Sequence, residues 1–166
     1  MIATDIEIRP LTEADSARYR EIRLESLRLC PATFSVTLEM ESSHSLEWFA
    51  KRLSFSRMVG AFQGDEIVGI AGFLVHQGNC AHSGRIIAVY VRERFRNQNV
   101  GRRLMEAILA IAAEHVELVQ LSVLSENLPA RRLYSNLGFE EYGIERKSHK
   151  YAGRYYDQVL MMKELV

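Results

Sequence analysis

The segment "GRIIAVYVRERFRNQNVGRRLMEAILAIAAEHV" (residues 84–116) is the most informative part of the sequence for the fold, because it leads from a predicted strand through a polar turn into a predicted helix. Residues 84–91 are typical of a strand, and residues 100–116 are typical of a helix. Phosphates are commonly held at such a turn, by backbone N–H groups and the positive end of the helix dipole. These turns usually contain several glycines, whereas residues 96–101 contain only Gly101. The turn is therefore either a phosphate-binding loop or an ordinary polar loop.

The composition is that of a soluble globular protein. The 166 residues, 48% hydrophobic and 25% charged, fit a single domain spanning 1–166. No apolar run approaches the roughly 18–20 residues that span a bilayer, and the first residues lack a signal-peptide pattern. Two cysteines, Cys30 and Cys80, do not form a disulfide framework, so we expect a reducing, cytoplasmic location without membrane association.

The charge is balanced overall but uneven along the chain. A net charge of zero argues against general nucleic-acid binding. Arginine supplies 17 of the 21 basic residues, and five arginines fall within residues 92–103, where Glu93 is the only acid. They are Arg92, Arg94, Arg96, Arg102 and Arg103. Arginine suits bidentate phosphate contacts, although a run of charges is just as often a solvated surface.

The first third of the chain predicts one strand and two helices. Residues 5–11 alternate as a strand that ends near Pro10, and Thr12 with Asp15 resembles a capping box for a helix that extends to about Leu29. Pro31 ends that helix, residues 31–43 are predicted as a loop, and residues 45–55 as a second short helix.

The remainder predicts strands with two more helices between them. Residues 57–79 are expected to form two strands around a tight turn at 63–65, and the strand 84–91 and the helix 100–116 follow. Residues 119–125 form a strand, and a helix then begins at 127 with Pro129 in its first turn and ends at Gly138. Residues 140–165 form two long strands that turn at 152–153. The order β-α-α-β-β-β-α-β-α-β-β predicts an α+β or α/β domain with a mostly antiparallel sheet.

Two motifs within this order resemble the GNAT superfamily of acyl-CoA-dependent N-acetyltransferases. One is "VYVRERFRNQNVGRRL" (89–104), similar to the family's strand followed by Arg/Gln-x-x-Gly-x-Gly/Ala. The other is "NLPARRLYSNLGFEEYG" (127–143), similar to its Asn…Ala…Tyr…Gly-Phe helix. The segments 8–15 and 153–165 resemble small bacterial members. The resemblance implies a central mixed, mostly antiparallel twisted sheet of about seven strands, flanked by about four helices.

The same resemblance implies an acetyl-CoA site without a metal. Backbone N–H groups of residues 97–102 would hold the pyrophosphate, Arg96 and Arg102 would add charge, and Arg131 would reach the adenine or 3′-phosphate end. The pantetheine arm would pair with the edge of residues 89–91, as in β-augmentation, and an N–H near Val91 would polarise the thioester carbonyl. The predicted cofactor residues are Val89, Tyr90, Val91, Arg96, Asn97, Gln98, Asn99, Val100, Gly101, Arg102, Asn127, Arg131 and Tyr134.

One position departs from the family pattern. Asn99 stands where the family usually has its first glycine. Asparagine is among the non-glycine residues that enter the left-handed region most readily, so we expect a strain of about 1 kcal/mol and an intact loop.

Tyr134 and Asn127 are the predicted catalytic residues. A phenol can protonate the thiolate that leaves when an amine attacks a thioester, and the resemblance assigns this general-acid role to Tyr134. Without the family, Tyr134 would be a core residue on the stripe of Ala130 and Leu137. By resemblance Asn127 bonds the pantetheine arm, and its alternative role is an N-cap.

The general base and the acceptor stay open at this stage. Residues 84–91 lack the glutamate that some family members use, which leaves Glu39, Glu41, Glu145 and Asp157 as candidates acting through water. His76, Cys80 and His82 have no fourth ligand at a zinc-site spacing. The leading hypothesis is an enzyme that acetylates a primary amine. The alternatives are a CoA-binding sensor without turnover and, more weakly, a nucleotide-binding regulator, which lacks a Walker lysine. A monomer and a homodimer both stay open.

Overall fold

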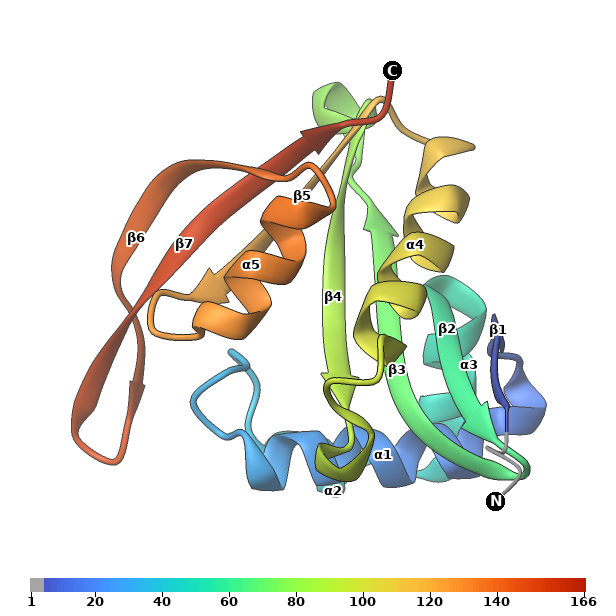
Figure 1. Cartoon of the computed structure of the whole chain (residues 1–166). Helices are drawn as coiled ribbons and strands as arrows, with labels where there is room; N and C mark the ends of the chain where they lie inside the picture. Colours follow the sequence, from blue (N-terminus) through green and yellow to red (C-terminus); the bar gives the residue numbers. More distant parts are fainter. Residues whose placement is uncertain (1–4) are drawn as a thin grey trace.

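The chain forms one seven-stranded sheet in the order β1-β2-β3-β4-β5-β7-β6, seen in a computed structural model that describes residues 5–166 (Figure 1). The strands are β1 (Ile6–Pro10), β2 (Arg57–Gln63), β3 (Glu66–Val75), β4 (Ser83–Val91), β5 (Leu118–Leu124), β6 (Glu140–Tyr151) and β7 (Arg154–Glu164). Only β4 and β5 run parallel, and every other neighbouring pair is antiparallel. The mixed, mostly antiparallel sheet is therefore confirmed.

Helices cover both faces of the sheet. They are α1 (Ser16–Leu29), α2 (Leu38–Ser42), α3 (Leu46–Phe55), α4 (Val100–Ala113) and α5 (Leu128–Asn136). Leu104 and Ile108 of α4 share one buried cluster with Tyr134 of α5. Ile22 of α1 and Phe49 of α3 belong to a second cluster, on the other side of the sheet. The sheet thus separates α4 and α5 from α1 and α3.

The first helices differ in detail from the prediction. The Asp15 carboxylate accepts the N–H of Thr12 at 2.9 Å, as a capping box requires, but a short 3-10 turn (Glu13–Asp15) precedes α1. The predicted loop 31–43 contains α2, which is capped by Thr37 Oγ1 accepting from the N–H of Met40. Residues 5–166 therefore contain five α-helices where about four were predicted. The additional helix is α2, whose five residues are too few to show a helical period.

The end of α4 differs from the prediction, whereas two later turns agree with it. Helix α4 ends at Ala113 rather than at the predicted Val116, because the N–H groups of His115 and Val116 both return to the carbonyl of Ala112. Further along, Gly138 has a φ of +89° just after α5, and the β6–β7 hairpin turns at Ala152 and Gly153, both in the left-handed region. These two turns agree with the sequence prediction.

Candidate active site

The two parallel strands β4 and β5 separate partway along their length (Figure 1). They pair only where Ser83–Arg85 lie opposite Leu118–Gln120. In the pairing of β3 with β4, Gly72 lies opposite Ile87 and Ile70 opposite Tyr90, so β4 contains one extra residue. Ala88 within this bulge has a φ of +53°. A bulge bends its strand, which leaves an unpaired edge on β4 beyond Arg85.

The backbone of Val91 points toward this gap. The N–H of Arg92 donates to the carbonyl of Val68 at 2.9 Å, which makes these two residues a hydrogen-bonded pair. In an antiparallel ladder the neighbouring pair, here Gly69 and Val91, turns its polar groups away from the shared edge. The N–H and C=O of Val91 therefore face β5 across the gap.

The turn after β4 presents a row of unbonded backbone donors. Within residues 5–166, no carbonyl accepts from the N–H groups of residues 97–102, and the first bond of α4 runs from Arg103 to Asn99. Asn97 and Asn99 both adopt left-handed conformations, with φ values of +60° and +62°. The asparagine that replaces the family glycine thus has the backbone conformation expected of it. Together with the start of α4, these donors form a site suited to an anion.

Most of the clustered arginines are already paired with carboxylates. Arg92 bonds Glu21, Glu25 and Glu66, which ties β4 to α1 and β3. Arg94 also pairs with Glu66, and Arg102 pairs with Glu106 one turn further along α4. Arg96 instead donates through Nε to the carbonyl of Val91 at 2.9 Å. Arg96 is therefore the arginine of this group best placed to add charge to the turn.

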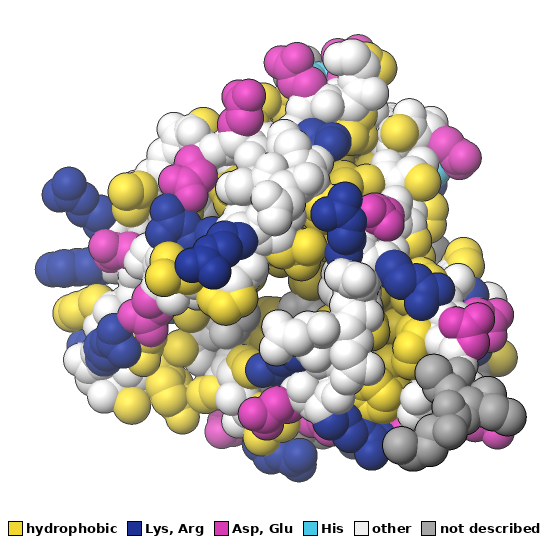
Figure 2. Space-filling view, viewed as in Figure 1, with side chains coloured by type: hydrophobic (Ala, Val, Ile, Leu, Met, Phe, Trp, Pro, Cys, Tyr) yellow, Lys and Arg dark blue, Asp and Glu magenta, His cyan; other side chains and the backbone are white. Residues whose placement is uncertain are grey.

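A cleft of about 770 Å³ lies between the separated strands, and Figure 2 shows a hollow in this face with basic side chains around it. Its walls are β4, β5, the turn after β4, the start of α5 and residues 33–36. The predicted cofactor residues in the wall are Val89, Tyr90, Val91, Arg96, Asn97, Asn99, Val100, Gly101, Arg102, Asn127 and Tyr134. The structure thus brings the two motifs, which residues 105–126 separate in the sequence, into one wall.

Two predicted cofactor residues lie outside this wall. The side-chain amide of Gln98 donates to the carbonyl of Arg94. Arg131 pairs with Glu141 at 2.8 Å and donates to the carbonyl of Ser125. A contact between Arg131 and the nucleotide stays a prediction, and it would have to compete with these bonds.

Tyr134 lies in the cleft wall with little exposure to solvent. Only 7% of the residue is accessible, and its ring packs 5.9 Å from that of Phe139. Burial raises the pKa of the Tyr134 phenol to about 12, because a phenolate would be poorly solvated there. The hydroxyl is therefore protonated at neutral pH, as a general acid must be.

Asn127 begins α5 and caps it. Its Oδ1 accepts the N–H of Ala130 at 3.3 Å. The N-cap role is therefore present, and it leaves the Nδ2 group of a cleft-lining residue as a donor.

This arrangement of strand, turn and helix matches a known family. The model of the acetyltransferase (GNAT) family matches residues 20–139. The chain belongs to the GNAT family of acetyltransferases. A 26% identity over 152 residues relates it to the N-alpha-acetyltransferase RimI of Mycobacterium tuberculosis, covering 89% of this chain and 87% of that protein.

Two further similarities extend over nearly the whole chain. This GNAT protein is 25% identical over 158 residues to the L-amino acid N-acetyltransferase AaaT of Escherichia coli, covering 92% of this chain and 96% of that protein. Its fold resembles that of yncA from Salmonella typhimurium, a structure with its cofactor acetyl-CoA. That likeness has a TM-score of 0.80 and 20% identity, and covers 97% of this chain and 94% of yncA. The protein is thus an N-acetyltransferase by family.

None of the four carboxylates proposed as the base lines the cleft of this GNAT acetyltransferase. Glu41 is buried in an ion pair with Arg23, and Asp157 accepts the N–H of Lys147. Glu39 and Glu145 are exposed. Among the described residues, the cleft wall contains no carboxylate at all.

His149 of β6 is a cleft residue that the sequence analysis missed. Its Nδ1 lies 2.8 Å from the carbonyl of Ala32. A carbonyl can only accept, so Nδ1 donates in this bond, and the neutral ring then has its lone pair on Nε2. Ala32 is 117 residues away in sequence, so no local pattern could have indicated this contact.

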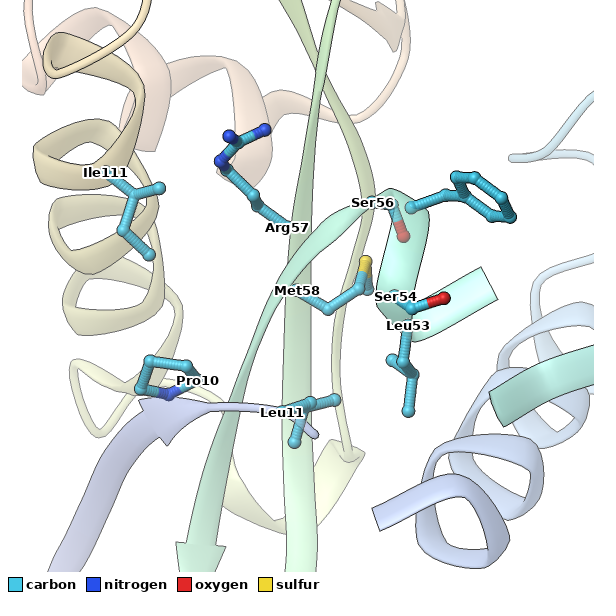
Figure 3. Close-up of a pocket in the computed structure, with 9 residues that line it drawn as sticks. Pro10, Leu11, Leu53, Ser54, Ser56, Arg57, Met58 and Ile111 are labelled. Atoms are coloured by element: carbon cyan, nitrogen blue, oxygen red, sulfur yellow. The ribbon is translucent and has the colours of Figure 1, made fainter. Parts of the chain in front are cut away.

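The rest of the described chain offers less for chemistry. A second hollow of about 490 Å³ is bounded by Pro10, Leu53, Met58 and Ile111, with Arg57 beside it (Figure 3). It contains no acid or histidine. Residues 5–166 contain no group of three or more His, Cys, Asp or Glu arranged to hold a metal. No described helix is long and apolar enough to span a membrane.

Proposed function

We propose that the protein transfers the acetyl group of acetyl-CoA to a primary amine by direct attack, with Tyr134 as general acid. The observation that carries the proposal is the single cleft wall. It joins the unbonded N–H groups of residues 97–102, the outward-facing backbone of Val91 and the protonated phenol of Tyr134. Pyrophosphate, thioester and leaving sulfur each have a matching group along this wall.

The reaction then needs three events along the wall. The neutral amine attacks the thioester carbonyl, a C–N bond forms, and the N–H of Val91 stabilises the oxyanion. The C–S bond breaks, and the Tyr134 hydroxyl gives its proton to the sulfur of CoA. The proton lost by the amine nitrogen leaves through a base, and solvent returns a proton to Tyr134.

His149 is the base that we propose for the amine proton. An alkylamine has a reference pKa near 10 and arrives mostly protonated, so a proton acceptor is required. The bond to Ala32 fixes the tautomer of the neutral imidazole, in which Nε2 has the lone pair that can accept a proton. His149→Gln should lower kcat/KM about 10- to 100-fold while leaving acetyl-CoA affinity unchanged. Equal loss in a Ser148→Ala variant, whose residue neighbours His149 on β6, would argue for a structural role instead.

The relatives agree with this chemistry. One is named for acetylating N-alpha groups and another for acetylating L-amino acids, and both kinds of acceptor present an amine. The structure of yncA contains acetyl-CoA as its cofactor. Acetyl-CoA is therefore the donor that we expect here.

Incubation with acetyl-CoA and a panel of primary amines tests the proposal. Released CoA thiol and the acetylated amine, detected by mass spectrometry, should appear in equal amounts. Tight binding of acetyl-CoA without acetylation of any amine would favour the sensor without turnover and would overturn the proposal.

A further inference from the structure

One end of the cleft contains a buried group of charges that the acetyl-transfer chemistry does not use. Arg23 of α1 bonds Glu41 of α2 twice, with Nε and Nη2 at 2.8 and 3.0 Å from the carboxylate oxygens. Both side chains are only 4% exposed. Arg52 of α3 approaches the same carboxylate at 3.5 Å. Three helices therefore meet around one carboxylate.

The charges in this group do not cancel. Two guanidinium groups face one carboxylate, which leaves one positive charge in excess. Arg23 and Arg52 line the cleft, whereas Glu41 does not. The excess charge therefore lies on the cleft side of the group.

Arg23 also has a buried donor without a partner. Its Nη1 is shielded from solvent and makes no hydrogen bond within the described chain. This nitrogen is on the side of the guanidinium away from the two bonds to Glu41. A buried polar group is normally bonded, and leaving one unpaired is costly. Because Nη1 is shielded from solvent, an anion that accepts from it must displace the side chains that cover this end of the cleft.

The surrounding wall favours a small acceptor. The ring of Phe34, in the cleft segment 33–36, covers the Arg23 guanidinium at 4.9 Å. The His149–Ala32 bond ties the residue just before that segment to β6. The same cleft of about 770 Å³ must also take the pantetheine arm, so the space left is suited to a small molecule.

We propose that Arg23, helped by Arg52, binds a carboxylate of the acceptor, so that the amine substrate is a small amino acid. This inference rests on the proposed function, because it uses the same cleft and the same acetyl transfer. It adds a subsite for the acceptor's acid group, on the α1 and α3 side of the cleft.

Substrate pairs test the subsite without changing the protein. We would measure kcat/KM for each common L-amino acid and for its own α-carboxamide, with saturating acetyl-CoA. The best amino acid should exceed its amide by about 10- to 100-fold, the value expected for a charged hydrogen bond. The difference in amine basicity favours the amide, because its amine is less basic and a larger fraction of it is neutral at a given pH. A faster reaction of the acid would therefore not come from amine protonation. Equal rates for acid and amide, or a preference for peptide N-termini, would overturn the inference and leave the proposed function standing.

Variants locate the effect in these residues. The double change Arg23→Gln/Glu41→Gln removes both buried charges together, which avoids leaving one ion unpaired. It should lower the acid-to-amide ratio substantially, with Arg52 supplying the preference that remains, and leave acetyl-CoA affinity unchanged. Arg52→Gln should reduce the ratio partly. Arg57→Gln, beside the second hollow, should keep the wild-type ratio.

A binding measurement separates failure of this inference from failure of the proposed function. L-amino acids and their amides would be titrated calorimetrically into the wild-type protein saturated with CoA. Binding of an acid but not of its amide supports the subsite even if no amine is acetylated. Binding of neither, or of both equally, would overturn it.

Discussion

Burial keeps the Tyr134 hydroxyl protonated, so this side chain can donate a proton but is not ready to accept one. Desolvation raises its pKa, so the phenol holds its proton, and the same burial places it in the wall along which the thioester is expected to lie. Packing against Phe139 and a chemical role are therefore compatible. A substitution that keeps the ring distinguishes the two.

Tyr134→Phe should lower kcat by roughly 10²–10⁴-fold while the fold and the acetyl-CoA affinity stay nearly intact. The change removes only the hydroxyl, so a residue that merely packs would show little kinetic effect. Tyr90→Phe is the matched control, because Tyr90 lines the same cleft but its hydroxyl donates to Glu25 of α1. A decrease of less than about threefold with chemistry rate-limiting would place the acid elsewhere.

The pH dependence of the reaction checks the same residue. A pKa raised to about 12 means that the acid form of Tyr134 persists as the pH rises and is lost only near that value. The pH profile of kcat should therefore show no decline assignable to Tyr134 between about pH 7 and 10. A decline in that range that disappears in Tyr134→Phe would contradict the assigned pKa.

At Asn99, the effect of the backbone conformation can be tested separately from the effect of the side-chain amide. It holds a φ of +62° at the entrance to α4. Asn99→Gly should leave acetyl-CoA affinity unchanged or tighten it by up to about 1 kcal/mol, because glycine adopts this conformation without strain. Asn99→Ala, which keeps a Cβ without asparagine's tolerance of the left-handed region, should weaken binding. A clear loss of affinity in Asn99→Gly, measured by calorimetry, would mean that the Asn99 side chain itself contacts the ligand.

Among the secondary-structure elements, the residue that caps the start of the first helix also bonds to strand β1 of the sheet. Asp15 accepts from Thr12 and also pairs with Arg9 of β1, at 2.8 and 2.9 Å. The Arg9 guanidinium, with the Thr12 N–H, lowers the pKa of Asp15 to about 2. The carboxylate thus stabilises the folded state above the unfolded pKa of about 4, and that stabilisation is lost as the pH falls toward 2.

Asp15→Asn should therefore reduce the unfolding free energy at neutral pH by about 1–2 kcal/mol, a figure that allows for the partly exposed Arg9. Urea unfolding at a series of pH values provides the measurement. The difference from wild type should shrink between about pH 4 and 2. Asp65→Asn, which removes a fully exposed partner of Arg18, should leave the unfolding curve unchanged. A constant difference across this pH range would contradict the role assigned to the Arg9–Asp15 pair.

Local sequence patterns predicted most helices and strands, but they could not predict contacts between residues far apart in the sequence. The succession of strands and longer helices along the chain, and the turns at Gly138 and 152–153, depend on residues close in sequence, so local patterns indicated them correctly. The five-residue α2 has no period to detect. The Arg23–Glu41 pair and the His149–Ala32 bond join separate elements, and nothing local marks such partners. The arginines near the turn looked alike in sequence, whereas Arg92 serves to tie α1 to the sheet.

In the molecule as a whole, the separation of β4 from β5 determines where the residues of the cleft meet. Pairing between β4 and β5 stops after Arg85, the bulge at Ala88 turns β4 aside, and the cleft occupies the gap. α4 and α5 bring the turn and Tyr134 to it from one face. α1 and α3 bring Arg23 and Arg52 to it from the other. The donor and the acceptor would thus approach the gap from opposite faces of the sheet.

We propose that the turn after β4 holds the pyrophosphate of acetyl-CoA, and calorimetry tests this proposal. Acetyl-CoA, its 3′-dephospho form and S-acetylpantetheine, which lacks both the pyrophosphate and the adenosine 3′-phosphate, would each be titrated into the protein in the presence of a chelator. We predict micromolar binding of acetyl-CoA, unaffected by the chelator, and binding of the 3′-dephospho form at least about 100-fold tighter than that of S-acetylpantetheine, since two charged hydrogen bonds account for that ratio. No binding of acetyl-CoA at high micromolar concentration, or equal affinity for the 3′-dephospho form and S-acetylpantetheine, would contradict the account.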